Sequence, residues 1–564
     1  MSSIRKPGLS VNRQRLIYLP LGGAGEIGMN AYVYGYGEPN KERFILVDLG
    51  ITFPDMDSTP GVNLILPDLA WLEERADRLE AIFISHAHED HVGALPLLWE
   101  DLRAPVYARP FVAEIARRKF EEYSVAQEGL RTTEIWPHQI EAGPFTVSFI
   151  PLSHSVPESS SLSIQTPAGH VIHTGDFKLD SSPVVGDAFD EQLWQQVSAD
   201  GVQALVCDST NVFVTRSGRS EGKLSPAIEE LIQSSKGVVV ATTFASNIAR
   251  LKTLADAGTR AGRSICLLGR AMRRMIEAAK ETGILSNFPT VISPSEAALI
   301  PRENLMLLVT GSQGEPRAVS AQLSVGRYKN IDLVAGDLFL FSSKTIPGNE
   351  KAVLKIINNL SRKGVAVIDD SSDRFHVSGH ANQPDLERIH TIVDPKIVIP
   401  MHGERRHLEQ HVTMCREGGR EAIVAANGMM IDLTNEVPKV AETVPSGRMY
   451  FDGDVLIPAR DGVVRDRIRM ALNGLVAVSV VQTKSSKPVF RCSVVIRGLW
   501  QGENGFVMKV ALETELNKSI GRLSGQVLHD DEELEEAIRR CVRKETVNLI
   551  GKRPEVSVII TRIA

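Results

Sequence analysis

Three imidazoles and the Asp90 carboxylate lie within six positions in the stretch His86-Ala87-His88-Glu89-Asp90-His91. This stretch follows Ala81-Ile82-Phe83-Ile84, an apolar run typical of a short buried strand. We therefore expect the polar cluster on the loop at the carboxyl end of that strand. Such a loop can bind two cations, one through His86 and His88 and the other through Asp90 and His91. Imidazole and carboxylate ligands suit Zn²⁺ and Mn²⁺, and without a thiolate nothing favours a closed structural zinc site.

More apolar runs deliver a histidine or an aspartate where they end. They are 145–150 before His154, 169–173 before Asp176, 205–207 before Asp208 and 397–401 before His402. A single histidine after a strand is usually an ordinary surface group. Several such strand ends beside the H-x-H-x-D-H pattern instead predict that strands from distant parts of the chain bring these side chains to one site.

The composition is that of a globular protein with more than one domain. The chain has 564 residues, of which 43% are hydrophobic and 23% are charged, and this length predicts two to four domains. No apolar run is long enough to span a membrane. Five scattered cysteines without C-x-x-C spacing indicate reduced thiols and a cytoplasmic protein. The net charge of -6 argues against a surface that is basic throughout and binds nucleic acid by charge alone. A polyanion would therefore have to bind to a local basic patch or to a metal ion.

Residues from about 224 to 370 alternate strand and helix patterns, which predicts a second α/β unit with a parallel sheet. The loops that follow its strands carry Ser, Asn, Gln and Gly, residues that suit anions better than metals.

The motifs together resemble a known group of metallohydrolases. His86-x-His88-x-Asp90-His91, His154, Asp176 and His402 are similar, in order, to the metal-binding motifs of the metallo-β-lactamase superfamily. Asp208, His380 and His402 lie where its nucleic-acid-cutting β-CASP group carries additional motifs. Four strings resemble the bacterial ribonuclease J family, from about residue 15 to the C-terminus. They are Phe244-Ala245-Ser246-Asn247, 310–316, 376–380 and 400–404.

The resemblance implies an α/β fold: a four-layer αβ/βα metallo-β-lactamase sandwich with an inserted β-CASP domain and a small α+β C-terminal domain. The expected boundaries are a flexible arm at 1–15, the first part of the metallo-β-lactamase domain at 16–218, the β-CASP domain at 219–372, the return segment of the metallo domain at 373–444, a linker at 445–465 and the C-terminal domain at 466–564.

The resemblance also implies 5′-to-3′ exoribonuclease activity, with endoribonuclease activity as a second mode, in RNA maturation and mRNA decay. The expected substrate is single-stranded RNA with a 5′-monophosphate end. A homodimer or homotetramer is expected through the C-terminal domain, and no membrane association.

The candidate ligands divide between two Zn²⁺ ions, with Mn²⁺ as the alternative. One ion takes His86, His88 and His154, the other takes Asp90, His91 and His402, and Asp176 bridges them. The hydroxide held between two such cations can attack phosphorus in line. His380 is the candidate general acid for the leaving 3′-oxygen, with Asp208 hydrogen-bonded to its ring; a purely structural His–Asp pair is the alternative.

A directional exonuclease needs a pocket for the 5′-phosphate. We expect its donors in the loop His376, Val377, Ser378, Gly379 and His380, with Ser246, Asn247 and Ser312 across the cleft. An ordinary Ser/Gly turn is the alternative for this loop. Asp48 and Asp452 are expected near a structural cation away from the active site.

Three other functions are compatible with the sequence. A lactonase or thioesterase of the same superfamily has no use for an insertion of roughly 200 residues between Asp176 and His402. A DNA-directed β-CASP nuclease is distinguished from an RNA-directed one by competition between RNA and DNA. A non-catalytic RNA-binding subunit is disfavoured by the complete set of seven ligands.

Overall fold

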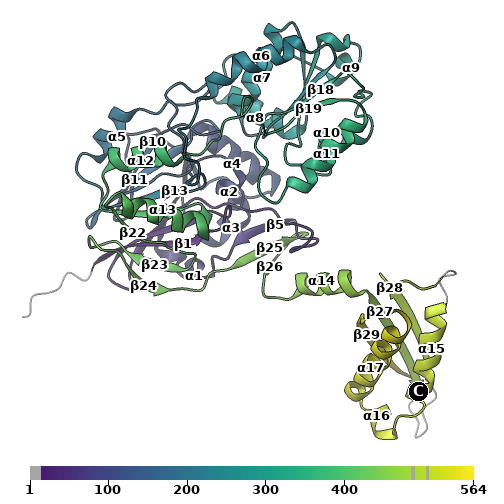
Figure 1. Ribbon diagram of the computed structural model, residues 1–564. Coiled ribbons are helices and arrows are strands. Elements are labelled where there is room, and N and C mark those ends of the chain that lie inside the picture. Colours follow the sequence, from purple (N-terminus) through teal and green to yellow (C-terminus); the bar gives the residue numbers. More distant parts are fainter. Residues whose placement is uncertain (1–13, 372, 484–489, 503–506, 564) are drawn as a thin grey trace, which may run out of the picture. The chain divides into compact units, whose positions relative to one another are not determined.

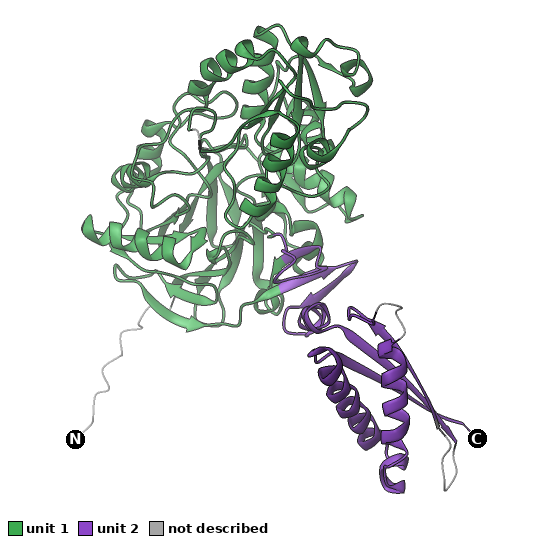
Figure 2. Cartoon of the chain, turned by 45° about the vertical axis from the view of Figure 1, so that its right-hand side comes forward, with its two compact units in different colours: residues 1–52, 66–448 green, residues 53–65, 449–564 purple. Residues whose placement is uncertain are grey.

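The computed structural model describes residues 14–371, 373–483, 490–502 and 507–563. Most of the expected N-terminal arm therefore lies outside the described residues. The chain divides into two compact units, Met1–Thr52 with Leu66–Arg448, and Phe53–Ile65 with Met449–Ala564 (Figure 2).

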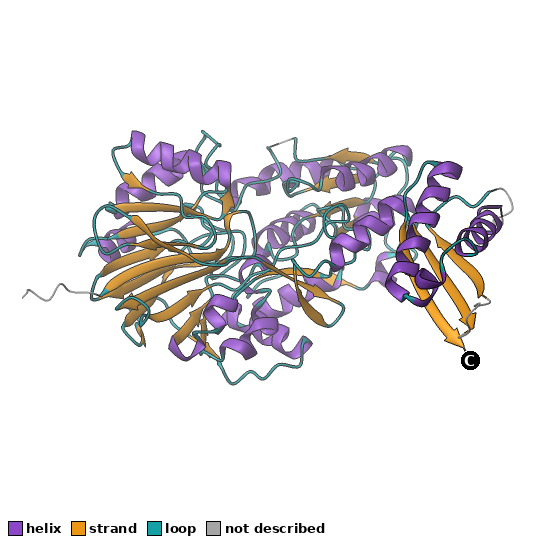
Figure 3. Cartoon of the chain, turned by 90° about the horizontal axis from the view of Figure 1, so that it is seen from below, coloured by secondary structure: helices purple, strands orange, loops and turns teal. Residues whose placement is uncertain are grey.

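Two large sheets face each other in the first unit, with helices outside them (Figures 1 and 3). The eight-stranded sheet runs β24 (Lys439–Thr443), β23 (Met429–Asp432), β1 (Arg15–Gly22), β3 (Ala31–Gly37), β4 (Arg43–Val47), β6 (Leu79–Phe83), β7 (Val106–Ala108), β8 (Leu130–Thr132). The seven-stranded sheet runs β22 (Glu421–Ala422), β20 (Ile397–Met401), β13 (Ala204–Asp208), β12 (Gly169–His173), β11 (Ser160–Thr166), β10 (Phe145–Pro151), β9 (Ile140–Ala142).

Side chains that alternate along the strands of the seven-stranded sheet pack into two separate cores, one on each face of the sheet. Val206 of β13 packs between the two sheets with Phe83 and Phe149, whereas its neighbour Cys207 belongs to the core on the outer face with Trp194. The helices of that outer face are α5 (Glu191–Ser198), α12 (Gln383–Val393) and α13 (Arg405–Glu417). These layers confirm the expected αβ/βα sandwich.

The inserted domain contains a third sheet, which has six parallel strands. Its order is β16 (Val291–Ile292), β15 (Ser264–Leu268), β17 (Leu305–Val309), β14 (Val239–Thr242), β18 (Leu338–Phe341), β19 (Ala366–Ile368). Among its helices are α6 (Ser225–Ser234), α7 (Ile248–Arg260), α8 (Arg270–Glu281), α10 (Val319–Val325) and α11 (Glu350–Arg362), which Figure 1 shows around the sheet. The prediction of a second α/β unit is confirmed.

The second unit contains a three-stranded sheet of order β28 (Phe490–Arg497), β27 (Leu475–Thr483), β29 (Glu555–Ile563). Helices α15 (Val507–Ile520) and α17 (Asp531–Ile550) cover one face of it, through Leu512, Leu516, Ile538 and Val542. No described helix is both long and apolar enough to cross a bilayer.

Two expected boundaries differ from the structure. The segment 445–465 is a linker in the sequence-based division, but it contains the hairpin β25 (Arg448–Asp452) and β26 (Val455–Pro458), which closes through Gly453 at φ 62°. Residues 53–65 group with this second unit and not with the metallo domain, because β5 (Leu64–Pro67) extends the same sheet and the Asn63 amide donates to the Phe451 carbonyl. Because β5 and β25 are far apart in the sequence, no local sequence pattern predicts that they pair.

Candidate metal centre

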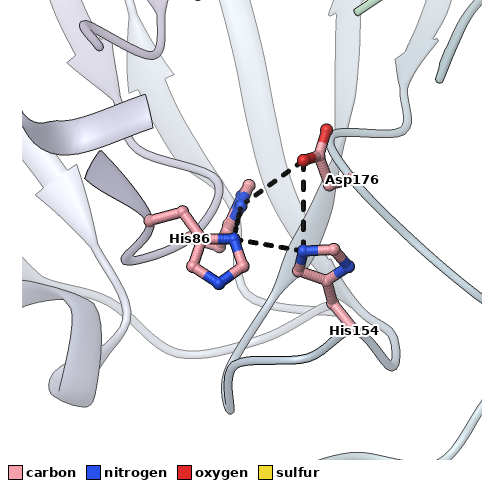
Figure 4. Close-up of side chains that lie close together, drawn as sticks. His86, His154 and Asp176 are labelled. Carbon is pink, nitrogen blue, oxygen red and sulfur yellow. Dashed lines mark hydrogen bonds and ion pairs between the residues drawn. The ribbon is translucent and has the colours of Figure 1, made fainter. Parts of the chain in front are cut away.

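The first group of candidate ligands gathers around one ring nitrogen of His88. Its Nδ1 lies 3.1 Å from Nε2 of His86 and 3.2 Å from Nε2 of His154. The Asp176 carboxylate faces the same point, with Oδ2 3.8 Å from the His86 nitrogen and 3.9 Å from that of His154 (Figure 4). The four residues form one cluster that could hold a cation.

The second group lies on the other side of the same carboxylate. Nε2 of His91 is 3.2 Å from Oδ2 of Asp176, and Nε2 of His402 is 3.1 Å from Oδ2 of Asp90. With Asp176 these three residues form a second candidate cluster. Asp176 is thus common to both groups, as a bridging carboxylate has to be.

Strand ends explain how residues so far apart in sequence meet. His86 and His88 follow β6, His154 follows β10, Asp176 follows β12 and His402 follows β20. Because β6 is in one sheet and the other three strands are in the facing sheet, loops of both sheets contribute ligands.

An outer ring of partners orients the imidazoles. The Nδ1 atoms of four histidines each contact an oxygen outside the cluster: Ser85 Oγ at His86 (3.0 Å), Asp48 Oδ2 at His91 (2.7 Å), the Gly379 carbonyl at His154 (2.6 Å) and Thr210 Oγ1 at His402 (2.9 Å). Such partners fix the ring and leave Nε2 for a metal. His88 is reversed: its Nδ1 faces inward and its Nε2 lies 3.4 Å from Ser155 Oγ.

Asp48 corrects one expectation from the sequence. Its carboxylate bonds His91 and accepts from the Ser85 amide at 2.7 Å, so it belongs to the candidate centre and not to a separate cation site. Asp452 lies in the other unit and pairs with Arg467 at 2.6 Å. Neither residue is in a candidate metal cluster among the described residues.

The backbone is adapted to this packing at three points. Asp48 and His402 both have positive φ, 62° and 50°, which is uncommon for residues other than glycine and is found where a site holds its side chains in place. A Cβ at Gly379 would lie 2.8 Å from Cε1 of His154, so only glycine lets this loop approach the candidate ligand.

Burial and charge divide the histidines into two kinds. Burial lowers the pKa of His88 to about 4 and lowers the pKa of His86 and His154 well below the usual value, so these three rings are neutral. Burial also lowers the pKa of His402, but Asp176, Asp208 and Asp90 outweigh it and raise that pKa to about 10.

The donor set fits divalent cations. The neutral rings of His86, His88 and His154 lie on one side of the Asp176 carboxylate, and His91 and His402, whose pKa values are raised, lie on the other. The pKa of Asp176 stays below its usual range, because His402 and His91 outweigh the effect of burial. Oδ1 of Asp176 is buried without a hydrogen-bond donor among the described residues. Nδ1 of His402 lies 3.2 Å from this oxygen without forming a hydrogen bond to it. Buried polar atoms normally have a partner, and a bound cation would supply one here.

His380 and Asp208 form a pair beside the two groups. Nδ1 of His380 lies 2.8 Å from Oδ2 of Asp208 and 4.0 Å from Oδ2 of Asp176. Burial lowers the pKa of His380, but Asp208 outweighs it, so the pKa of this ring is above its usual value.

A pocket of about 260 Å³ opens beside His380. Four of the expected phosphate-binding residues line it: His376, Val377, Ser378 and His380. Sequence reasoning missed its four basic lining residues, which are Lys178, Arg216, Arg219 and Lys344.

Three residues expected across the cleft do not line this pocket. Ser246 and Ser312 are absent from its lining, and the side-chain oxygen of Asn247 accepts from the Arg250 amide, which caps helix α7. Asparagine before a helix is an ordinary N-cap signal, and this capping accounts for Asn247.

Four family models match the chain. They are described as Beta-lactamase superfamily domain (44–210), Ribonuclease J, beta-CASP domain (236–360), Zn-dependent metallo-hydrolase RNA specificity domain (372–425) and Ribonuclease J C-terminal domain (462–563). The chain is 39% identical to a protein of Sinorhizobium meliloti named Ribonuclease J, over 98% of each chain. The chain belongs to the ribonuclease J family.

Further comparisons agree with membership of the ribonuclease J family. A Ribonuclease J of Mycolicibacterium smegmatis is 33% identical over 95% of each chain, and a Ribonuclease J 1 of Streptococcus pyogenes is 33% identical over 87% of each. A solved protein of unknown function from Enterococcus faecalis is similar in fold, with a TM-score of 0.51 and 17% identity over 74% of this chain and all of its own. The ribonuclease J assignment and the His/Asp clusters together identify a metal-binding hydrolase.

Proposed function

We propose that this member of the ribonuclease J family is a two-metal 5′-to-3′ exoribonuclease that also cuts internally, and that it acts in RNA maturation and mRNA decay. Family membership makes the chain an RNA-degrading metallohydrolase. The observation that carries the two-metal proposal is Asp176, whose carboxylate is common to both candidate ligand groups.

The residues present fit two cations. His86, His88 and His154 would hold one, Asp90, His91 and His402 the other, and Asp176 both; imidazole and carboxylate suit Zn²⁺, with Mn²⁺ as the alternative. When bound, such a pair supplies Lewis acidity, which lowers the pKa of water toward about 7 and neutralises charge on the phosphodiester.

His380 is the proposed proton donor to the leaving 3′-oxygen. Its ring is close to Asp176 and is held by Asp208, which favours the protonated form. Asp208 acts through His380 and is therefore a positioning residue.

The loop 376–380 is the proposed site for the 5′-monophosphate. The Ser378 hydroxyl oxygen accepts from Nδ2 of Asn211 at 2.8 Å and from the His380 amide at 3.2 Å, which leaves its proton for a phosphate oxygen. An Arg250 N–H points at Nδ1 of His376 at 3.3 Å, so the remaining proton of that neutral ring is on Nε2 and can also be donated. With the basic residues of the pocket wall, these donors suit a monophosphate better than the bulkier triphosphate.

The proposed partners are single-stranded RNA and further copies of the chain. The outer face of the β28-β27-β29 sheet exposes Val495 by 55% and Ile559 by 59%, which supports a homodimer or homotetramer through the C-terminal domain. Five free thiols, four of them buried, support a cytoplasmic location.

The digestion pattern of RNA labelled at either end tests this function. After metal removal, adding back Zn²⁺ or Mn²⁺ singly should restore release of mononucleotides from a 5′-monophosphorylated RNA, more slowly from a 5′-triphosphorylated one. The same strand made as DNA should compete poorly. An Asp176→Ala variant that degrades RNA as fast as the parent would exclude the two-metal proposal, and equal rates on both 5′ ends would exclude the pocket.

A further inference from the structure

A separate cluster of metal-ligating side chains lies on the outer face of the seven-stranded sheet. It consists of Cys207 of β13, His390 of α12 and His411 of α13, and one ligand atom of each lies within 4.8 Å of those of the other two. Their exposed fractions are 0%, 1% and 0%. Because Cys207 packs in the outer core, it faces away from the core between the two sheets.

The two imidazoles of this cluster are spaced like ligands of one ion. Nε2 of His390 lies 3.2 Å from Nε2 of His411, the same distance that separates the facing nitrogens of His154 and His88 in the candidate centre. Two nitrogens bound to one tetrahedral Zn²⁺ at 2.0–2.1 Å are about 3.3 Å apart.

The outer ring nitrogens have partners of their own. Nδ1 of His411 lies 2.9 Å from Ser209 Oγ, and Nδ1 of His390 lies 3.9 Å from the sulfur of Cys415. Outer partners of this kind orient metal-bound histidines. Burial lowers the pKa of His390 well below its usual value and that of His411 to about 4, so both rings are neutral and keep a lone pair.

We propose that Cys207, His390 and His411 bind a structural Zn²⁺ ion, separate from the candidate active centre. A thiolate with two imidazoles favours Zn²⁺ over Mn²⁺ or Mg²⁺. Binding displaces the thiol proton of Cys207, whose pKa is raised by burial, to solvent. The three side chains supply three of the four ligands that a structural Zn²⁺ usually has.

Such an ion joins three elements that carry active-site residues. Strand β13 ends at Asp208, α12 begins three residues after His380, and α13 begins three residues after His402. The proposal goes beyond the proposed function, because a ribonuclease with or without this ion is consistent with the candidate centre.

Cobalt substitution distinguishes this site from the candidate centre, since the centre offers only nitrogen and oxygen. Full-length protein loaded with Co²⁺ should show a thiolate-to-cobalt charge-transfer band in the near ultraviolet. The band should be lost in Cys207→Ser and kept in Cys266→Ser, a control at another fully buried cysteine, in β15. A band that survives in Cys207→Ser, or no band in the parent at saturating Co²⁺, would overturn the proposal.

X-ray absorption at the zinc edge tests the site without any variant, in case Cys207→Ser does not fold. The parent protein should show a zinc–sulfur distance of about 2.3 Å in addition to the nitrogen and oxygen distances. A spectrum with nitrogen and oxygen neighbours only would mean that His390 and His411 form a hydrogen-bonded pair without metal.

Discussion

Oδ2 of Asp48 lies 2.7 Å from Nδ1 of His91, and both side chains are fully buried. The same carboxylate accepts from the amide and the hydroxyl of Ser85, at 2.7 and 2.8 Å. Ser85 therefore holds the Asp48 carboxylate independently of His91. The carboxylate in turn holds the His91 ring so that Nε2 points at Asp176. Asp48 is in no candidate metal cluster of the described residues itself, but it sets the orientation of the candidate ligand His91.

Asp48→Asn should weaken metal binding by about 10- to 100-fold, because an amide holds the His91 ring less firmly and makes its Nε2 a weaker ligand. Competition with a chromophoric chelator measures the affinity, and circular dichroism checks the fold. Asp452→Asn, at the aspartate that the sequence grouped with Asp48, should leave the affinity unchanged. Equal affinities for Asp48→Asn and the parent would contradict the role given to Asp48.

His380→Gln should slow cleavage by about 10²- to 10⁴-fold, because the leaving oxygen loses its proton donor. The pKa of His380 is raised, so its proton is present below that pKa and is lost as pH rises through it. The parent's rate should therefore fall on the alkaline side, and the variant should lack this fall.

A substrate with a 3′-sulfur leaving group provides the control for His380, since a thiolate leaves without protonation. It should be cut by parent and His380→Gln at similar rates. If the variant is as slow on this substrate as on ordinary RNA, His380 acts in some other way than as an acid.

The fold and the candidate ligands follow from the sequence because they depend on local patterns. Apolar strands, polar strand ends and the His86–His91 spacing are visible without knowing which strands are neighbours. The seven expected ligands all lie in two candidate clusters, and both of these contain Asp176.

Positions that depend on tertiary packing could not be predicted in this way. Asp48 is also at a strand end, but whether it faces a cation or the back of a histidine depends on β4 lying beside β6. The requirement for glycine at position 379 could not be predicted either, because it arises from the close approach of His154 and Ser155, which are distant in the sequence. Arg250 looks like an ordinary surface arginine of helix α7, yet its side chain is fully buried.

Arg250→Met should lower the free energy of unfolding of the first unit by about 3–5 kcal/mol, since it leaves Glu221 buried without its partner. Arg250 donates to the Ser342 carbonyl at 2.6 Å and faces His376, a residue of the proposed 5′-monophosphate site. Because the variant should disturb that site, it should also raise KM for 5′-monophosphorylated RNA more than it lowers kcat. Chemical denaturation and steady-state kinetics measure the two effects.

Arg260→Met is the matched control for Arg250→Met. Arg260 is on the same helix and also pairs with a glutamate, Glu229, but its side chain is 48% exposed. An exposed pair contributes at most about 1 kcal/mol, so this variant should change neither stability nor KM appreciably. Similar losses for both variants would mean that burial of the Arg250 pair has no special role.

Ile559→Lys should reduce the molar mass of the protein in solution, because it replaces an exposed apolar side chain in the middle of the sheet face proposed for self-association with a charge. Analytical ultracentrifugation at micromolar concentration measures this. Val547→Lys is the control: Val547 is 46% exposed, but it is on α17, a helix that covers the opposite face of the sheet. We expect Val547→Lys to keep the parent's mass. A parent that is monomeric at all concentrations, or an Ile559→Lys variant with unchanged mass, would exclude this face as the contact between copies.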